Sequence, residues 1–136
     1  MPLNVVFDTN ILISAAGWNG PPRKCVQLAR EGYVNGAVCT ELLLEYAEKL
    51  ETVLAFPRFT ADEAVIELLS FLRLVDIYGA IRGVARDPDD DMILDCAVTA
   101  GAGYIVSGDK DLLVLGQFRE IKVVKAAEFL EIVAKQ

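Results

Sequence analysis

The sequence predicts an α/β fold, a three-layer α/β/α sandwich in which helices cover both faces of a central parallel sheet. The main observation is that short apolar runs of the strand type alternate with helical segments along the whole chain. These runs have the continuous hydrophobicity of strands that are buried on both faces. With 136 residues and 54% hydrophobic content the chain has the size of one domain, so we expect residues 1–136 to form a single unit.

The first strand and two helices are expected before residue 31. Residues 3–7 form a short β-branched apolar run that ends at Asp8, and a helical stretch follows over residues 9–16. The turn at residues 17–22 closes with two prolines. Because proline favours the first position of a helix, we expect a second helix through Arg30.

The middle of the chain continues this alternation. Residues 34–38 are expected to form a second strand, which leads into a helix with Thr40 as its N-cap. Thr60 and Glu63 have the spacing of a capping box. They predict a helix that runs through about Leu74.

The last third contains an acidic helix and two further strands. The acidic segment at residues 87–91 opens a helix that extends to Ala102, and a strand follows at residues 104–106. After a turn at residues 107–111, the last strand is expected near residues 121–124, before a terminal helix.

The absence of histidine excludes several kinds of chemistry. It removes Ser-His-Asp and Cys-His nucleophile systems, the usual zinc ligand sets, and ribonuclease mechanisms that use a pair of imidazoles. The three cysteines, Cys25, Cys39 and Cys96, contain no CxxC pair, and we expect them to be buried as small hydrophobic residues. Any chemistry must therefore come from carboxylates.

The net charge of -7 argues at first against nucleic acid as a partner, because phosphate binding normally needs a basic surface. Net charge averages over the molecule, however, so a local basic surface that binds nucleic acid is still compatible with the sequence. Its candidate residues are Arg23, Lys24, Arg58, Arg82, Arg86 and Lys110.

No charge-free stretch reaches the length of about 18 residues that a membrane span requires. Met1 leads into the first apolar run without a basic leader. We therefore expect a cytoplasmic protein with no membrane partner.

Asp91 and Asp95 stand four residues apart on a helix that is apolar nearly all round. Burying two like charges at this spacing requires compensation. The run Asp89, Asp90 and Asp91 has an ordinary explanation, since acids favour a helix N-terminus. Asp95 is a fourth acid, more than the stabilisation of a helix N-terminus needs. This excess favours at least one metal ligand among the aspartates of this helix.

Four other acidic residues have an ordinary explanation beside a functional one. Asp8 ends the first strand, where it could cap a helix, and Asp109 and Asp111 lie in a Gly-Asp turn. Glu45 could form a surface ion pair with Lys49, four residues further on. Residue patterns alone do not choose between these explanations.

The expected sheet brings three acids together. Asp8 and Asp109 follow strands and Asp91 begins a helix, so all three belong at the carboxyl edge of the sheet, where such folds bind ligands. Two carboxylates about 4 Å apart repel by roughly 1 kcal/mol in water and roughly 4 kcal/mol at an effective dielectric near 20, so the group needs protons or a cation. Oxygen ligands without histidine or cysteine favour Mg²⁺ or Mn²⁺.

Two segments resemble a known family. The opening strand ends in Phe-Asp-Thr-Asn, and the run from Arg86 to Leu113 contains Asp-Pro-Asp-Asp-Asp and Ser-Gly-Asp-Lys-Asp-Leu-Leu. Both look like a PIN-domain protein, and the resemblance spans nearly the whole chain. It is closest to the toxin components of bacterial and archaeal toxin-antitoxin pairs, related to the VapC-type ribonucleases.

The resemblance implies a site of four acids, Asp8, Glu45, Asp91 and Asp109. The choice of Glu45 depends on the resemblance alone. Asp90 could claim the third position, and Asp111 could assist the fourth.

The resemblance also implies a magnesium-dependent endoribonuclease for single-stranded RNA, commonly a homodimer whose antitoxin partner blocks the site. Manganese could replace magnesium. Thr9, Asn10 and Ser107 would then support the ligands or hold the phosphate through hydrogen bonds, although each also fits a cap or a turn.

Three other classes of protein share some of these features. A phosphatase with an aspartyl nucleophile needs a second acid two residues after Asp8, where this chain has Asn10. A signalling receiver domain carries its phosphorylated aspartate after a middle strand, and no such strand end is evident. A catalytically silent PIN module that binds RNA or an antitoxin stays open, although the complete acid set counts against it.

Overall fold

The computed structural model of the chain describes residues 2–136 and has a six-stranded sheet at its centre, in the order β3-β2-β1-β4-β6-β5. The strands are β1 (Asn4–Phe7), β2 (Asn35–Cys39), β3 (Arg73–Val75), β4 (Tyr104–Val106), β5 (Gln117–Phe118) and β6 (Ile121–Val124). All neighbouring strands are parallel except β5 and β6. The predicted α/β architecture with a mainly parallel sheet is therefore confirmed.

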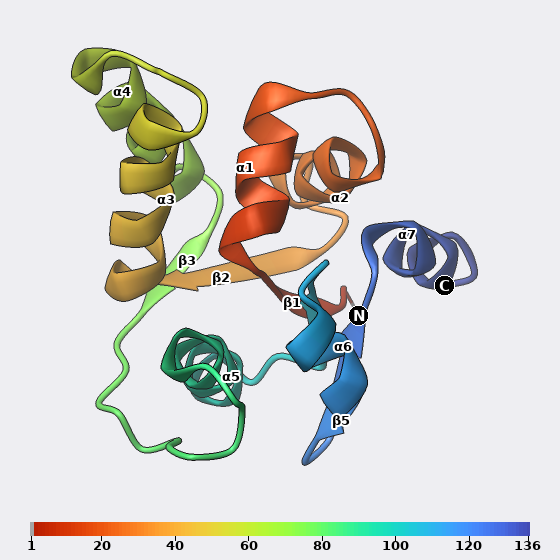
Figure 1. The fold of residues 1–136 in the computed structure, drawn as a ribbon. Helices are drawn as coiled ribbons and strands as arrows, with labels where there is room; N and C mark the ends of the chain where they lie inside the picture. The colour runs from red at the N-terminus through yellow and green to blue at the C-terminus, as the bar shows by residue number, and fades with distance from the viewer. Residues whose placement is uncertain (1) are drawn as a thin grey trace.

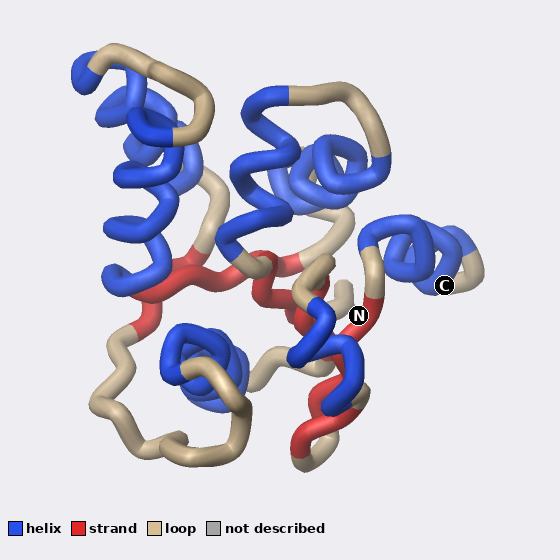
Figure 2. The backbone as a smooth tube through the Cα atoms, in the orientation of Figure 1, coloured by secondary structure: helices blue, strands red, loops and turns tan. Residues whose placement is uncertain are grey.

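Helices cover both faces of this sheet. They are α1 (Thr9–Gly17), α2 (Pro21–Arg30), α3 (Thr40–Thr52), α4 (Arg58–Leu69), α5 (Pro88–Ala100), α6 (Lys110–Leu115) and α7 (Ala126–Ala134). Figures 1 and 2 show α1 to α4 and α7 on one side of the sheet and α5 on the other. Within residues 2–136, no helix combines the length and the apolar character that a bilayer crossing demands.

β1 lies between β2 and β4 in the middle of the sheet. Val6 of β1 is in register with Ala37 of β2 and with Ile105 of β4. Because the three strands run in the same direction, the residues that follow them emerge at one edge. This carboxyl edge therefore receives Asp8 after β1 and Ser107 after β4.

Two predictions about helix starts are wrong. α4 begins at Arg58 with Pro57 at its N-cap, so Thr60 lies inside the first turn and forms no capping box with Glu63. The helix ends at Leu69, since residues 73–75 pair with β2 as an edge strand. α3 already begins at Thr40, and the N-cap is the preceding Cys39.

The last third contains elements that the sequence pattern did not indicate. α5 begins at Pro88, and its N-cap Asp87 accepts a hydrogen bond of 2.9 Å from the Asp89 N–H. It ends at Ala100, before the predicted Ala102, because Gly101 takes the left-handed conformation (φ 67°) that terminates helices. The short helix α6 and strand β5 were not predicted, and β5 adds an antiparallel edge to the sheet.

The core fills the space between sheet and helices with aliphatic and aromatic side chains. Phe7 of β1 meets Phe129 of α7 edge-on, with ring centroids 6.5 Å apart. All three cysteines are buried, as expected from the sequence, and they are free thiols.

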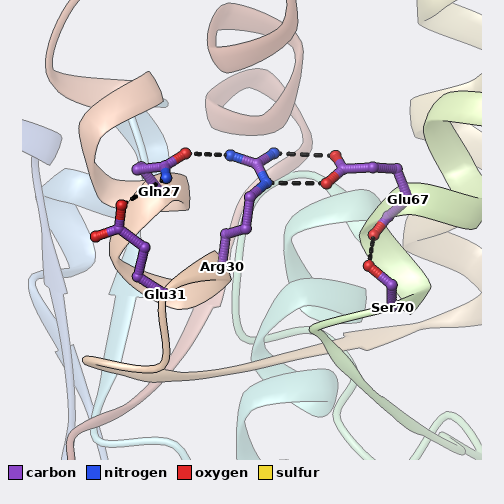
Figure 3. Close-up of polar contacts among 5 residues, drawn as sticks. All are labelled: Gln27, Arg30, Glu31, Glu67 and Ser70. Atoms are coloured by element: carbon purple, nitrogen blue, oxygen red, sulfur yellow. Dashed lines mark hydrogen bonds and ion pairs between the residues drawn. The ribbon is translucent and has the colours of Figure 1, made fainter.

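An ion pair joins α2 to α4 above the sheet. The guanidinium of Arg30 donates two hydrogen bonds of 2.9 Å to the carboxylate of Glu67 and a third to Gln27 (Figure 3). The same guanidinium stacks over Phe71, 4.9 Å from the ring centroid. This two-point contact fixes α2 relative to α4.

Candidate metal centre

A small acidic cleft lies at the carboxyl edge of the sheet. Its volume is about 90 Å³, and residues from α1, α3, α5 and two segment ends line it: Asp8, Asn10, Glu45, Lys49, Asp87, Asp89, Asp90, Ile93 and Asp109. The cleft therefore collects carboxylates from four separate parts of the chain.

Asp8 is buried at the N-terminal end of α1, directly after β1. It stands at the N-cap position, but its side chain makes no capping hydrogen bond. Instead Oδ2 accepts a hydrogen bond of 2.7 Å from the Ser107 hydroxyl. Burial raises the pKa of Asp8, the Ser107 hydrogen bond opposes this, and the Asp109 and Glu45 carboxylates add to the increase.

Ser107 links two of the predicted acids. Its hydroxyl donates to Asp8 and accepts a hydrogen bond of 3.0 Å from the Asp109 N–H. Asp109 in turn caps α6, since its Oδ1 accepts from the N–H groups of Asp111 and Leu112. The capping explanation therefore holds for one oxygen of Asp109, while the residue also faces the cleft.

Asp90 has the least favourable surroundings of these acids. It is 6% exposed, and its Oδ2 is buried without a hydrogen-bond partner among the described residues. Burial together with the charges of Asp109 and Asp8 raises the pKa of Asp90 to about 7. One carboxylate oxygen each from Asp90, Asp109 and Asp111 lie within 4.8 Å of one another.

Asp91 does not join this group. Its carboxylate accepts hydrogen bonds from three backbone N–H groups, those of Gly83 (2.9 Å), Val84 (3.2 Å) and Ala85 (2.7 Å). Asp95 likewise accepts from the Ala80 N–H at 3.1 Å. These backbone donors supply the compensation that the two buried acids require, so the structure places Asp90 in the cleft in the position expected for Asp91.

The other predicted residues divide between the cleft and its rim. Glu45 lines the cleft and forms an ion pair of 3.3 Å with Lys49. Asn10 is exposed and accepts a hydrogen bond of 3.2 Å from Lys49. Thr9 is buried, and its hydroxyl has no partner within residues 2–136.

Three charged residues of the cleft, Lys49, Asp87 and Asp89, are not among the named site residues that the sequence predicts. Asp87 and Asp89 belong to the acidic segment that opens α5, and the sequence pattern indicates Lys49 only as a surface partner of Glu45. Burial raises the pKa of Asp89, the charges of Glu45 and Asp87 add to this increase, and the Lys49 charge opposes it. The position of α3 brings Lys49 to the cleft, and no local sequence pattern predicts that packing.

The donor set fits a hard divalent cation. Asp8, Asp90 and Asp109 offer only oxygen atoms, and the chain has no histidine. A buried polar atom without a partner costs free energy, and a bound cation would supply the missing partner of Asp90. Carboxylates of Glu45 and Asp111 are at hand to complete the coordination.

A mainly parallel α/β sheet with an acidic cleft at its carboxyl edge is the architecture that the sequence comparison now assigns to a family. The chain belongs to the PIN domain family, whose sequence profile matches residues 4–111. PIN domains are generally nucleases. A comparison with proteins of curated function found no match.

Two solved structures illustrate the shared fold. One is VapBC2 from Rickettsia felis bound to a DNA fragment from their promoter, with 15% identity over 89% of this chain and 97% of that chain, and a TM-score of 0.65. The other is PAE2754 from Pyrobaculum aerophilum, with 14% identity over 99% of this chain and 91% of that chain, and a TM-score of 0.65.

Proposed function

We propose that this protein is a divalent-metal-dependent endoribonuclease that hydrolyses phosphodiester bonds of single-stranded RNA. Family membership supports a nuclease, and the acidic cleft supports a metal-dependent one. The observation that carries the proposal is Asp90, a buried carboxylate beside Asp8 and Asp109 whose Oδ2 has no hydrogen-bond partner in the described part of the chain. A structural role does not account for such a residue, because it destabilises the fold.

Asp8, Asp90 and Asp109 would hold Mg²⁺ or Mn²⁺, with Glu45 and Asp111 assisting. When bound, the cation would supply an activated water and positive charge beside the phosphate. Ser107 keeps Asp8 oriented through its hydroxyl and fixes the backbone of Asp109 at the same time. No imidazole is needed for this chemistry.

The biological role that we propose is the toxin of a toxin-antitoxin pair, a cytoplasmic protein that acts as a homodimer. The resemblance to VapC-type ribonucleases supports this role, and one structurally similar chain comes from VapBC2. Its antitoxin would be encoded by a short neighbouring frame with a DNA-binding domain. Growth arrest on expression of the chain alone, relieved by that neighbour, is the expected result, and unimpaired growth would contradict the toxin role.

Two adjacent aspartates allow a sharp test of the enzymatic proposal. Asp90→Asn removes a carboxylate from the cleft, whereas Asp91→Asn changes a neighbour that does not line the cleft and whose carboxylate accepts hydrogen bonds from the backbone of residues 83–85. Cleavage of an unstructured RNA in Mg²⁺ or Mn²⁺, followed on gels, should fall by at least about 100-fold in Asp90→Asn. The Asp91→Asn protein, although less stable, should retain most of the activity.

EDTA should stop cleavage by the wild-type chain, and Asp8→Asn should abolish it without unfolding the protein. Circular dichroism of each variant controls for loss of the fold. Cleavage in EDTA, or equal activity of Asp90→Asn and wild type, would overturn the carboxylate-metal mechanism. Binding of RNA or an antitoxin without any cleavage would identify a silent PIN module, and release of phosphate from small monoesters would indicate a phosphatase.

A further inference from the structure

Lys49 is the one basic side chain that lines the acidic cleft within residues 2–136. Six carboxylates surround it there, those of Asp8, Glu45, Asp87, Asp89, Asp90 and Asp109. An RNA phosphate that approaches this cleft meets strong repulsion unless cations offset it. Among the residues that the structure describes, Lys49 provides the only positive charge in the lining.

Two contacts hold the ammonium group of Lys49 at the cleft. Nζ donates to Asn10 Oδ1 at 3.2 Å and lies 3.3 Å from Glu45 Oε1. Asn10 belongs to α1 and Lys49 to α3, so the hydrogen bond fixes the lysine between two elements. The ammonium group therefore has a defined position beside the carboxylates.

The pair with Glu45 is weak enough to rearrange. The side chains of Lys49 and Glu45 are 35% and 25% exposed, and the residues are one helical turn apart. Ion pairs of this kind on a helix contribute little to stability because water screens them. Lys49 is thus free to exchange a carboxylate for a phosphate at low cost.

A wider groove begins where the cleft ends. It has a volume of about 500 Å³ and runs along α3, lined by Leu44, Glu45, Glu48, Lys49, Thr52, Val53 and Asp89. Lys49 belongs to the lining of both cavities. Leu44 and Val53 are 66% and 58% exposed, so the groove offers apolar surface beside the charge.

We propose that Lys49 binds a backbone phosphate of the RNA adjacent to the one that is cleaved, and that the groove along α3 receives the attached nucleotide. This inference rests on the proposed function, because it presumes an RNA strand across the acidic cleft. The lysine provides the charge for the phosphate, and Leu44 with Val53 provides apolar contact for the sugar or base. Lys49 is then a substrate-binding residue that lies outside the set of metal-binding acids.

The test measures RNA binding without cleavage. In the wild-type background, fluorescence anisotropy of a labelled, non-hydrolysable analogue of an unstructured RNA is recorded in Mg²⁺ over a range of salt concentrations. Adding Lys49→Met should weaken binding about tenfold, the loss expected for one charge-assisted hydrogen bond. The slope of log affinity against log salt should fall by about 0.7, the value for one phosphate contact on a single strand.

Matched variants separate a phosphate contact from other effects. Lys135→Met removes a charge from the exposed C-terminal end of α7 and should change affinity less than about twofold. Lys49→Arg should retain binding, since it keeps the charge. Thermal melts show whether each variant is folded. Equal effects of Lys49→Met and Lys135→Met in folded proteins would overturn the inference.

The active enzyme provides the second readout. In the otherwise wild-type chain Lys49→Met should raise KM for RNA and leave the Mg²⁺ concentration needed for half-maximal activity unchanged. A change in the Mg²⁺ requirement with an unaltered KM would show that Lys49 is only a counterion of the acids, and would overturn the inference alone. A wild-type chain that neither binds nor cleaves RNA would overturn the proposed function together with it.

Discussion

At the scale of single residues, the neighbours Asp90 and Asp91 of α5 have different roles because their side chains point in different directions. Successive side chains on an α-helix point about 100° apart. Asp90 therefore faces the cleft, where its Oδ2 has no hydrogen-bond partner among residues 2–136, while Asp91 faces a loop that supplies three N–H donors. The first arrangement stores unfavourable free energy, and the second stabilises the fold.

Asp90 should make the stability of the protein depend on pH. Because its pKa rises from 3.8 to about 7 on folding, the folded chain retains a proton that the unfolded chain has released between about pH 4 and pH 7. Stability from this group is therefore lost as pH rises through that window. Urea unfolding in EDTA at pH 8 should show Asp90→Asn about 1 to 3 kcal/mol more stable than wild type.

The difference between the two proteins should shrink toward pH 4, where unfolded Asp90 begins to take up the proton that folded Asp90 already carries. Asp8, whose pKa is also raised, leaves part of the pH dependence in the variant. A gap between variant and wild type that is the same at pH 5 and pH 8 would contradict the raised pKa of Asp90.

Residue patterns predict some of this site and miss the rest for a definite reason. Asp8 and Asp109 follow apolar strand runs, so their place at the carboxyl edge can be read from the sequence. The choice between Asp90 and Asp91 depends on which side of α5 faces β1 and which faces the loop, and both residues precede the same apolar run. The position of Lys49 at the cleft depends on how α3 packs against α1, which sequence spacing does not encode.

At the scale of elements, the segment at residues 76–87 connects β3 to α5 without regular hydrogen bonding of its own. Side chains of α5 anchor it instead: Asp91 holds three backbone N–H groups and Asp95 holds one. Its last residue, Asp87, caps α5 and lines the cleft. Because Asp91 and Asp95 hold this segment, they also determine where Asp87 lies in the wall of the cleft.

Removal of the larger anchor should loosen this loop. Asp91→Ala leaves three N–H groups without their acceptor, so we expect a loss of about 2 to 4 kcal/mol in unfolding free energy. Hydrogen exchange at Gly83, Val84 and Ala85 should accelerate. The matched variant Asp95→Ala frees one N–H and should have the smaller effect on this loop. Equal exchange rates in wild type and Asp91→Ala would show that the carboxylate does not hold the loop.

Elements differ in how well the sequence indicates them. β1, β2, β4 and β6 lie in the middle of the sheet and are mostly apolar, with Lys122 of β6 as an exception, and their hydrophobicity suffices to locate them. β3 is an edge strand whose Arg73 and Leu74 are exposed, and pairing with β2 rather than local pattern determines it. α6 has six residues and β5 has two, lengths at which periodicity carries no signal.

At the scale of the whole molecule, parallel strand order brings distant segments to one edge. Asp8, Glu45, Asp90 and Asp109 come from α1, α3, α5 and α6 or their caps, and all four line the cleft. The site therefore exists only in the folded chain. A cation that binds there binds the native state alone and stabilises it.

This linkage predicts a thermal shift. At about 100 times its dissociation constant, Mg²⁺ or Mn²⁺ should add about 2.7 kcal/mol to the unfolding free energy of the wild-type chain, which corresponds to roughly 10 °C in Tm. Asp90→Asn should show little of this increase, since one of the binding carboxylates is gone. The Asp91→Asn protein serves as the control and should shift like wild type. Equal shifts in all three proteins would place the cation elsewhere.

The unpartnered oxygen of Asp90 also bears on how long the protein survives in a cell. Proteases act on chains that have opened, and the population of open chains rises as native stability falls. A chain without the proposed cation would keep the repulsion among the buried carboxylates and would open more often than a chain that has bound it. Degradation should therefore remove the inactive form first, so that the copies that persist are those already equipped for catalysis.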